Sequence, residues 1–471
     1  MGKAFRGAPW PVLLLVLSFL CPTEFSVYVG SVRLPTHRAL LIILLPLALF
    51  HSVGPKGGRL KLFDVTMLAF ASWVLMVHLI HHGVDAGLQA GGSQALDAFA
   101  SFLVARVYVR DAEAFRALTR MLFVVVAAAG MMALPEALTG RFYVHEFLGQ
   151  ITGYIHPTGV ETRLGLTRAF ATFDHPIHLG TFCSAGLAMC LYAERRSFGF
   201  WARAIIIPAS ALMGLSSAPM LSVAAQFGLM IAERISRGMR GRIVLGAGVM
   251  VAVMLVVGIV ATRSPFAIIA TGFTLDAWTG YYRLMIWEYG LDNVWAHPWI
   301  GLGLNDWARP TWMASPTVDA FWLLVAMRGG IPAIVFLLMT VVLLAWGVAR
   351  RISSYDQPQR ALARGWLISL TGLSLVGCTV HFWNVPYAFF FFLLGLGGWL
   401  ADPLRAAKRT TAGIPAPKPA KRLQWLPPAS LPGHLAMPQA MGRLVALAPH
   451  DQPRWPIPVL RTNLTPKAGR A

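Results

Sequence analysis

Two polar segments interrupt the apolar stretches of this chain, and each carries arginine. The first spans residues 159–176, and its polar residues include Arg163, Arg168, Asp174 and His175. The second spans residues 274–330, contains Arg283, and is far longer than a link between two helices needs to be. A guanidinium is charged at any pH, and its planar fork binds phosphate through two hydrogen bonds. We therefore expect an anion site at these arginines; the alternative for each is a pair with a carboxylate or a position at the lipid interface.

The second segment also contains residues suited to proton transfer. Asp319 lies just before the next apolar stretch, and a carboxylate there can accept a proton from a hydroxyl group if its pKa is suitable. The alternative for Asp319 is to cap the helix that begins there, because aspartate accepts hydrogen bonds from the first free amides of a helix. His297 precedes Pro298, and it either contacts the bound anion or is a turn histidine bonded to the backbone.

Composition identifies the broad class of protein. Of the 471 residues, 56% are hydrophobic and only 13% are charged, and the mean hydropathy is +0.60. Soluble domains have about 25% charged residues. The chain is therefore expected to be a polytopic membrane protein.

Apolar stretches long enough to cross a bilayer recur along the chain. Crossing about 30 Å of hydrocarbon takes roughly 17–25 residues in a helix. We expect about twelve such spans, near residues 10–29, 38–53, 62–81, 92–109, 117–138, 176–193, 202–216, 218–233, 243–262, 318–348, 363–382 and 385–401.

Orientation follows from the basic residues. Lysine and arginine gather at the N-terminus and in every second connection between the expected spans. Cytoplasmic loops carry this excess, so both termini are predicted to be cytoplasmic, with residues 81–92, 139–175 and 263–317 on the other side. The expected fold class is an all-α polytopic membrane protein with a transmembrane domain over residues 1–402. Its large external loop lies between the ninth and tenth helices.

The formal charge of +20 arises mostly from these connections and from residues 403–471. It is therefore weak evidence for a nucleic-acid partner, and we expect none. The tail is basic and rich in proline, which predicts a disordered cytoplasmic segment near anionic lipid headgroups. The alternative is a solubilising extension without a specific partner.

Soluble-enzyme chemistry and metal chemistry have little support. The four cysteines lie in apolar spans without a CxxC motif, which favours neither a disulfide framework nor a zinc site. The chain contains no P-loop, GxSxG or HExxH motif. We expect no metal and no cofactor.

One combination of motifs resembles a known family. Residues 167–176 read Thr-Arg-Ala-Phe-Ala-Thr-Phe-Asp-His-Pro, Arg283 and Trp287 lie in a helix-like run, and residues 296–305 read Ala-His-Pro-Trp-Ile-Gly-Leu-Gly-Leu-Asn. In order and spacing these motifs resemble the O-antigen ligase and polymerase superfamily of bacterial envelope polysaccharide assembly. The resemblance extends over most of the chain before the tail, and the large loop before the tenth span fits it.

This resemblance implies a glycosyltransferase on the periplasmic face of the bacterial inner membrane. Members move a glycan from undecaprenyl diphosphate to a hydroxyl of lipid A core or of a second lipid-linked glycan, and loop arginines are thought to grip the diphosphate. By position this implies Arg168 and Arg283 here. The expected partners are the lipid-linked donor, a glycan or glycolipid acceptor, membrane lipids, and chain-length regulators or export proteins.

Further substrate contacts are expected from Arg163 and His175, and the expected catalytic residues are Asp319 and His297. Ligases of the family continue with a His-Asn pair before the next helix, where this chain has Asp319 and Ala320. The departure favours a polysaccharide polymerase over a ligase, because the motif varies more among polymerases. The many Trp and Tyr residues of the loop either stack on sugars or form an interfacial belt, which is the default in membrane proteins.

Two other functions remain open. Twelve helices with both termini inside is a common transporter layout, and basic residues could line a path for an anionic glycolipid. Transporters, however, usually keep charged residues within broken spans, whereas the polar residues noted here lie in external loops. A scaffold acting through the basic tail would explain the tail but not the long loop.

Overall fold

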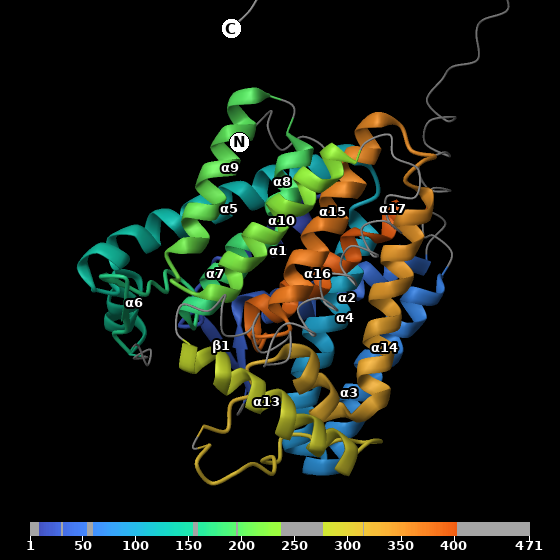
Figure 1. The fold of residues 1–471 in the computed structure, drawn as a ribbon. Helices are drawn as coiled ribbons and strands as arrows, with labels where there is room; N and C mark the ends of the chain where they lie inside the picture. Colours follow the sequence, from blue (N-terminus) through green and yellow to red (C-terminus); the bar gives the residue numbers. More distant parts are fainter. Residues whose placement is uncertain are drawn as a thin grey trace, which may run out of the picture. The chain divides into compact units, whose positions relative to one another are not determined.

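The computed structural model describes residues 9–29, 32–53, 60–153, 159–194, 196–236, 277–313 and 315–402. The predicted ninth span, the loop residues 263–276 and the predicted tail 403–471 lie outside the described residues. The described chain is mostly helical (Figure 1). Its elements are α1 Trp10–Ser18, β1 Ser26–Val29, β2 Val32–Pro35, α2 Thr36–Val53, α3 Leu62–Gly87, a π-helix Leu88–Gly92, α4 Ser93–Tyr108, α5 Ala112–Thr139, α6 Tyr143–Thr152, β3 Thr162–Arg163, β4 Leu166–Thr167, α7 Pro176–Ala185, α8 Leu187–Ala193, α9 Ser197–Leu212, α10 Ser217–Ile235, α13 Ala277–Ala296, α14 Phe321–Arg351, α15 Gln357–Val376, α16 Asn384–Leu396 and α17 Gly398–Ala401.

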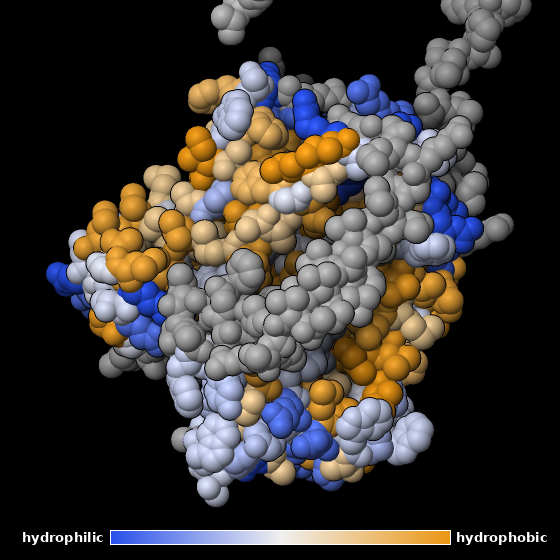
Figure 2. All heavy atoms as spheres, viewed as in Figure 1, coloured by the Kyte–Doolittle hydropathy of each residue, from blue (hydrophilic) through white to orange (hydrophobic). Residues whose placement is uncertain are grey.

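Several of these helices have the length and composition of membrane spans. In the described part of the chain five stretches qualify, namely Leu62–Tyr108, Ala112–Thr139, Pro176–Ala193, Phe321–Arg351 and Asn384–Ala401. Figure 2 shows hydrophobic residues over the sides formed by α5, α9 and α14, and hydrophilic residues at the end where α13 lies. The exposed hydrophobic residues of α14 include Val335, Val342 and Trp346. The chain is a helical membrane protein.

The first predicted span is wrong over its second half. α1 ends at Ser18, and residues Ser26–Val29 form an antiparallel pair with Val32–Pro35 instead of continuing the helix. Pro22 cannot donate a helical hydrogen bond, and the β-branched and aromatic residues that follow favour a strand. The other predicted spans within the described residues each overlap a helix or two consecutive helices, although α15 ends at Val376, before the predicted end at residue 382. Five stretches of the described residues have the length and composition of a span, so the predicted count of twelve stays a prediction.

The third and fourth predicted spans form one helical hairpin. Gly83 has φ 73° and ψ −174°, which breaks the helical path, and the chain then returns along α3. The Gln94 side chain of the returning helix reaches Nε2 of His78 at 3.3 Å. This hairpin carries the polar side chains of both helices into the interior.

The core is built around α16. Every residue from Val385 to Leu396 is buried, as expected for a helix that is hydrophobic on all sides. Its run of phenylalanines, Phe389–Phe392, contacts α1, α3 and α14 through aromatic rings. α14 packs along α3, with a 2.8 Å hydrogen bond between Thr66 and Thr340.

α14 is broken near its start by a glycine with left-handed backbone. Gly330 has φ 71°, and the segment after α13 docks onto the break through backbone hydrogen bonds. Leu302 donates to the Met327 carbonyl at 2.8 Å, and Ile331 donates to the Pro298 carbonyl at 2.7 Å. The His-Pro-Trp-Ile-Gly-Leu-Gly motif therefore fills hydrogen bonds that the broken helix cannot make by itself.

We expect Gly330→Ala to destabilise the protein. A Cβ at this position would lie 2.3 Å from the Trp299 carbonyl oxygen, and the left-handed backbone adds strain for any residue but glycine. The loss should be at least about 1 kcal/mol, seen as a lower thermal midpoint in detergent. Gly228→Ala in α10 is the matched control, because a Cβ there meets nothing within 4 Å. Equal thermal midpoints for the two variants would show that the segment docked on α14 can move to make room for the Cβ without a loss of stability.

Candidate functional site: an arginine cluster and a half-buried aspartate

The first polar segment folds into a small hairpin that presents two arginines. β3 and β4 pair antiparallel, with Thr162 opposite Thr167 and Arg163 opposite Leu166. The two turn residues between them, Leu164 and Gly165, both have positive φ, as a tight hairpin turn requires. Arg163 ends one strand, and Arg168 follows the other.

Both arginines are held by the turn between α9 and α10. Arg163 Nη1 donates to the Leu215 carbonyl at 3.3 Å. Arg168 donates through Nε to the Gly214 carbonyl at 3.3 Å and through Nη2 to Ser216 Oγ at 2.9 Å. The remaining arm of Arg168 pairs with Glu161, whose pKa is lowered below its usual value by this hydrogen bond and charge despite partial burial. These contacts fix the Arg168 side chain in place, and the Glu161 carboxylate balances its charge.

A buried carboxylate supports the backbone after Arg168. Glu136 in α5 accepts hydrogen bonds from the amides of Phe170 and Ala171 at 3.0 and 2.8 Å. Ala171 has φ 52°, an uncommon conformation for a residue with a side chain. The Glu136 carboxylate thus holds this segment in the path that places Arg168.

The second polar segment supplies its arginine from a helix. α13 confirms the helix-like run expected before His297, and it lies across the end of the long helices (Figure 1). Arg283 is only 8% exposed, and its Nε has no hydrogen-bond partner among the described residues. Burial lowers the pKa of Arg283; the charge of Asp319 raises it, and the charges of Arg163 and Arg168 lower it. The guanidinium nevertheless stays charged at neutral pH.

Asp319 does not cap α14. The residue in the cap position is Ala320, and the first amides of the helix are bonded to carbonyls of another segment: Phe321 to Val380 at 3.0 Å and Trp322 to Gly377 at 3.3 Å. The described residues offer the Asp319 carboxylate no hydrogen bond, and burial raises its pKa above the usual value, partly offset by Arg283. The capping alternative is therefore wrong, and a carboxylate with a raised pKa is a better base near neutral pH.

His175 caps α7 and is neutral. Its Nδ1 accepts a hydrogen bond from the Ile177 amide at 3.2 Å. Burial, with smaller contributions from the charges of Arg168 and Arg163, lowers the pKa of His175 to about 4. The ring also contacts Trp383 in the connection before α16. His175 thus lies beside the arginines without adding positive charge at pH 7.

The structure brings most of the predicted site together. The ionisable groups whose charges act on one another here are Arg163, Arg168, Arg283, Glu161, Asp319, Asp174 and His175. With His175 neutral, the three arginines of this arginine cluster are matched by three carboxylates, of which Asp174 accepts hydrogen bonds from Thr23 and Asn384. Arg283 and Asp319 come from the second polar segment and the other residues from the first, so the two segments share one site. Within this cluster the buried Nε of Arg283 has no hydrogen-bond partner among the described residues, and a desolvated guanidinium of this kind favours an anionic ligand.

His297 lies outside the cluster. It follows the C-terminus of α13, fourteen residues beyond Arg283, which at 1.5 Å per residue is roughly 20 Å along the helix. His297 is exposed, and its carbonyl accepts from the Gly301 amide at 3.1 Å in the turn that docks on α14. Its place in the fold is that of a turn residue.

Arg309 is tied into the loop itself. It pairs with Asp306, donates to the Met313 carbonyl at 3.0 Å, and lies over the Trp307 ring. The indoles of the loop divide into two groups: Trp307 is buried, whereas Trp295 is 70% exposed. Exposed tryptophans at this end suit an interfacial belt.

Sequence reasoning missed the partners of Arg168. Glu161 and Ser216 hold its guanidinium, but nothing in the spacing of the chain marks Ser216, which lies 48 residues away. The closeness of Glu161 in sequence was a usable signal, because a hairpin brings such residues to one end of a short sheet. Arg328 in α14 was also passed over, since it stands alone inside an apolar stretch.

No protein-family model matches the chain, and none of the curated proteins matches it in sequence. Fold and site together define a helical membrane protein with a buried arginine cluster at one end of its bundle. The function is therefore inferred from this site.

Proposed function

We propose that the protein is a lipid-linked-oligosaccharide glycosyltransferase that polymerises, or ligates, undecaprenyl-diphosphate-linked repeat units in exopolysaccharide or O-antigen synthesis. One observation carries the proposal. The charges of Arg163 and Arg168 from one loop act on Arg283 from another, and Arg283 acts in turn on Asp319, which has a raised pKa and no hydrogen bond among the described residues. Arginines that bind an anion, next to a carboxylate that can accept a proton, suit the transfer of a glycan from a diphosphate to a hydroxyl group.

The location is part of the proposal. The site lies at the end of the bundle opposite to the basic connections around Arg196 and Arg350, as seen from the positions of α9, α13 and α14 in Figure 1. With basic loops inside, the site faces the periplasm. We infer the bacterial inner membrane, about twelve spans, both termini cytoplasmic, and residues 139–175 and 263–317 on the periplasmic side.

The chemistry is an inverting glycosyl transfer. The acceptor oxygen attacks the anomeric carbon while the bond from that carbon to the diphosphate oxygen breaks, and the bonding electron pair leaves with the diphosphate. The acceptor proton passes to the Asp319 carboxylate. Negative charge grows on the diphosphate during the step, so fixed guanidiniums stabilise the transition state more than the ground state.

The arginines have different tasks in this scheme. Arg168 is oriented by Ser216 and Glu161, which makes it a rigid positioning cation. Arg283 has an Nε without a partner, so its fork is free for the diphosphate. Arg163 adds charge from the hairpin, and His175 offers a neutral ring at the rim.

An in vitro reaction tests the proposal. Full-length protein in neutral detergent, supplied with lipid-linked repeat units, should lengthen them and release the lipid diphosphate, both measured by mass spectrometry. Deleting the gene should make unpolymerised lipid-linked oligosaccharide accumulate. A folded preparation that releases no diphosphate from any lipid-linked glycan of the producing cell would contradict the proposal.

A transporter of lipid-linked glycan is the second candidate, and one observation favours it. α14 is broken at Gly330, and the neighbouring Arg328 faces a cavity within the span, the arrangement found in carriers. An experiment can distinguish the transferase from the transporter. A transferase works in detergent without compartments, whereas a transporter moves its substrate across sealed vesicles and leaves it chemically unchanged.

A further inference from the structure

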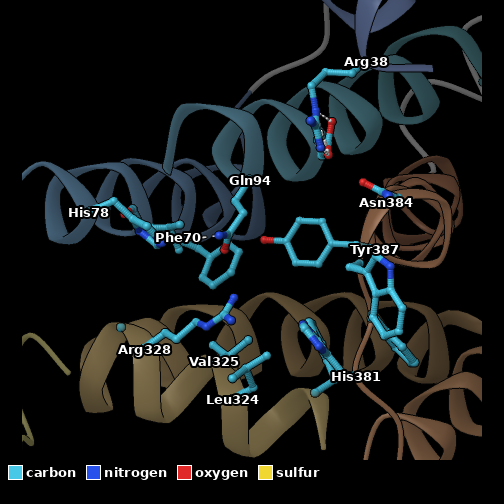
Figure 3. Close-up of a pocket in the computed structure, with 16 residues that line it drawn as sticks. Arg38, Phe70, His78, Gln94, Leu324, Val325, Arg328, His381, Asn384 and Tyr387 are labelled. Atoms are coloured by element: carbon cyan, nitrogen blue, oxygen red, sulfur yellow. Dashed lines mark hydrogen bonds and ion pairs between the residues drawn. The ribbon is translucent and has the colours of Figure 1, made fainter. Parts of the chain in front are cut away.

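A cavity of about 140 Å³ lies inside the bundle, and its lining residue Trp383 also contacts His175 of the arginine cluster. Its walls come from α2, α3, α4, α14 and α16 and from the connection before α16 (Figure 3). One water needs about 10–15 Å³ of such space. The cavity therefore admits a group of several heavy atoms, such as a phosphate, but not a whole oligosaccharide.

One of its two arginines is already neutralised. Arg38 in α2 forms a bidentate pair with Asp97 in α4, with nitrogen–oxygen distances of 2.6 and 3.0 Å. Figure 3 shows this pair at one side of the cavity, drawn with dashed lines. Asp97 is therefore occupied and does not compensate a second cation.

The other arginine of the cavity, Arg328, has no partner among the described residues. Arg328 points into the cavity toward Gln94 and Tyr387 (Figure 3), and no described residue gives it a hydrogen bond or an ion pair. The neighbouring backbone carbonyls already accept other hydrogen bonds: the Gly303 amide donates to the Arg328 carbonyl at 3.0 Å, and Trp73 Nε1 donates to the Gly329 carbonyl at 2.8 Å. The Arg328 guanidinium is therefore not required to satisfy them. An uncompensated guanidinium within a membrane span is costly, and such residues usually mark a ligand or ion site.

Neutral polar side chains lie around the Arg328 guanidinium. His78 Nδ1 lies 2.7 Å from the Val74 carbonyl and donates to it, which leaves Nε2 to accept from the Gln94 amide at 3.3 Å. The Gln94 amide oxygen lies on the side of Arg328 and Tyr387 (Figure 3). The Tyr387 hydroxyl points toward the same space (Figure 3) and makes no hydrogen bond with the described residues. A guanidinium and a hydroxyl that both lack a partner among the described residues suit an oxyanion.

We propose that the Arg328 cavity binds a phosphate-class oxyanion through residues other than those of the arginine cluster. Arg328 provides the charge and the fork, and the Tyr387 hydroxyl provides a neutral donor. A lipid headgroup or a free phosphate has the required chemistry. The site does not depend on the function proposed above, since it would serve a transporter equally well.

The test measures binding rather than activity. In one arm, the full-length protein is placed in nanodiscs of phosphatidylcholine with or without phosphatidylglycerol. In the other, inorganic phosphate or pyrophosphate is titrated in neutral detergent against chloride at equal ionic strength. Arg328→Met should weaken the anion-dependent rise in thermal midpoint, with an apparent affinity at least about tenfold lower. Both arms are repeated in Arg283→Met protein, so that the arginine cluster contributes less.

Arg350→Met is the matched control, because Arg350 lies on the same helix but is exposed over the Trp346 ring. A response to phosphatidylglycerol alone identifies a lipid headgroup as the occupant, and a response to phosphate or pyrophosphate alone identifies a soluble one. If Arg328→Met does not fold, Tyr387→Phe keeps the shape and should weaken binding roughly threefold to tenfold. Equal anion responses in wild-type and Arg328→Met protein, or no response in either arm, would overturn the proposal.

Discussion

Replacing Arg283 with lysine should remove most glycan transfer, about a hundredfold in initial rate, while the protein inserts and folds normally. Lysine keeps the charge but is a point donor, so it cannot bind a diphosphate through two parallel hydrogen bonds. The loss of a preorganised donor at a site of developing negative charge costs about two to three orders of magnitude. The rate of diphosphate release by the purified variant measures this directly.

Arg309→Lys is the control for this experiment. Arg309 lies in the same loop, but its fork is used by Asp306 and by the Met313 carbonyl. We expect a small effect on activity there. Near-normal transfer by Arg283→Lys would show instead that Arg283 serves only the packing of α13.

Arg283 is the better test than Arg168, for a structural reason. Arg168 holds Glu161, Ser216 and the Gly214 carbonyl, so its replacement disturbs the turn between α9 and α10 as well as the site. Arg283 has no hydrogen bond to lose among the described residues. Its replacement therefore reports on the ligand more than on the fold.

Much of the helical fold was predictable because membrane spans depend on local composition. Apolar length alone marks α5 and α14, and turn residues separate their neighbours. The hairpin Ser26–Pro35 was not foreseen, because its apolar residues add to a hydropathy window whatever conformation they adopt. The sequence predicts the strand only when the helix-breaking effect of Pro22 and the strand preference of the β-branched residues are considered together with the hydropathy.

The site was predictable in its charges but not in its geometry. The sequence singled out Arg168 and Arg283 from two separate polar segments, and in the structure the charge of Arg168 acts on Arg283. His297 belongs to a conspicuous motif, yet that motif docks on the break in α14 and lies away from the arginine cluster. A motif of turn residues looks the same in sequence whether it binds a ligand or another helix.

The Arg328 cavity escaped sequence reasoning for another reason. Its polar residues Gln94, Arg328 and Tyr387 lie on three helices that are distant in sequence. Each stands alone in an apolar stretch, so no local pattern groups them. Only the folded-back α3 and α4 hairpin and the packing of α16 place them around one space.

Asp319→Asn should lower transfer by about two to four orders of magnitude, the usual contribution of a positioned general base. Asparagine keeps the size of the side chain but cannot take the acceptor proton. Thermal stability and membrane level should barely change, because the carboxylate has no hydrogen bond to the described residues and the α14 amides are bonded to the Val380 and Gly377 carbonyls. Rates by the purified variant with a lipid-linked donor give the comparison.

The pH dependence makes this prediction specific to Asp319. Its pKa is raised by burial, so the reactive carboxylate is lost as pH falls through a value above that of an ordinary aspartate. Below that pKa, the wild-type rate should fall tenfold per pH unit, and Asp319→Asn should lack this acid limb at its low residual rate. Asp319→Glu, which restores a carboxylate, should recover part of the rate and the limb. Wild-type rates in Asp319→Asn, or an unchanged acid limb, would exclude Asp319 as the base and leave His175, which burial keeps neutral at pH 7, as the next group to test.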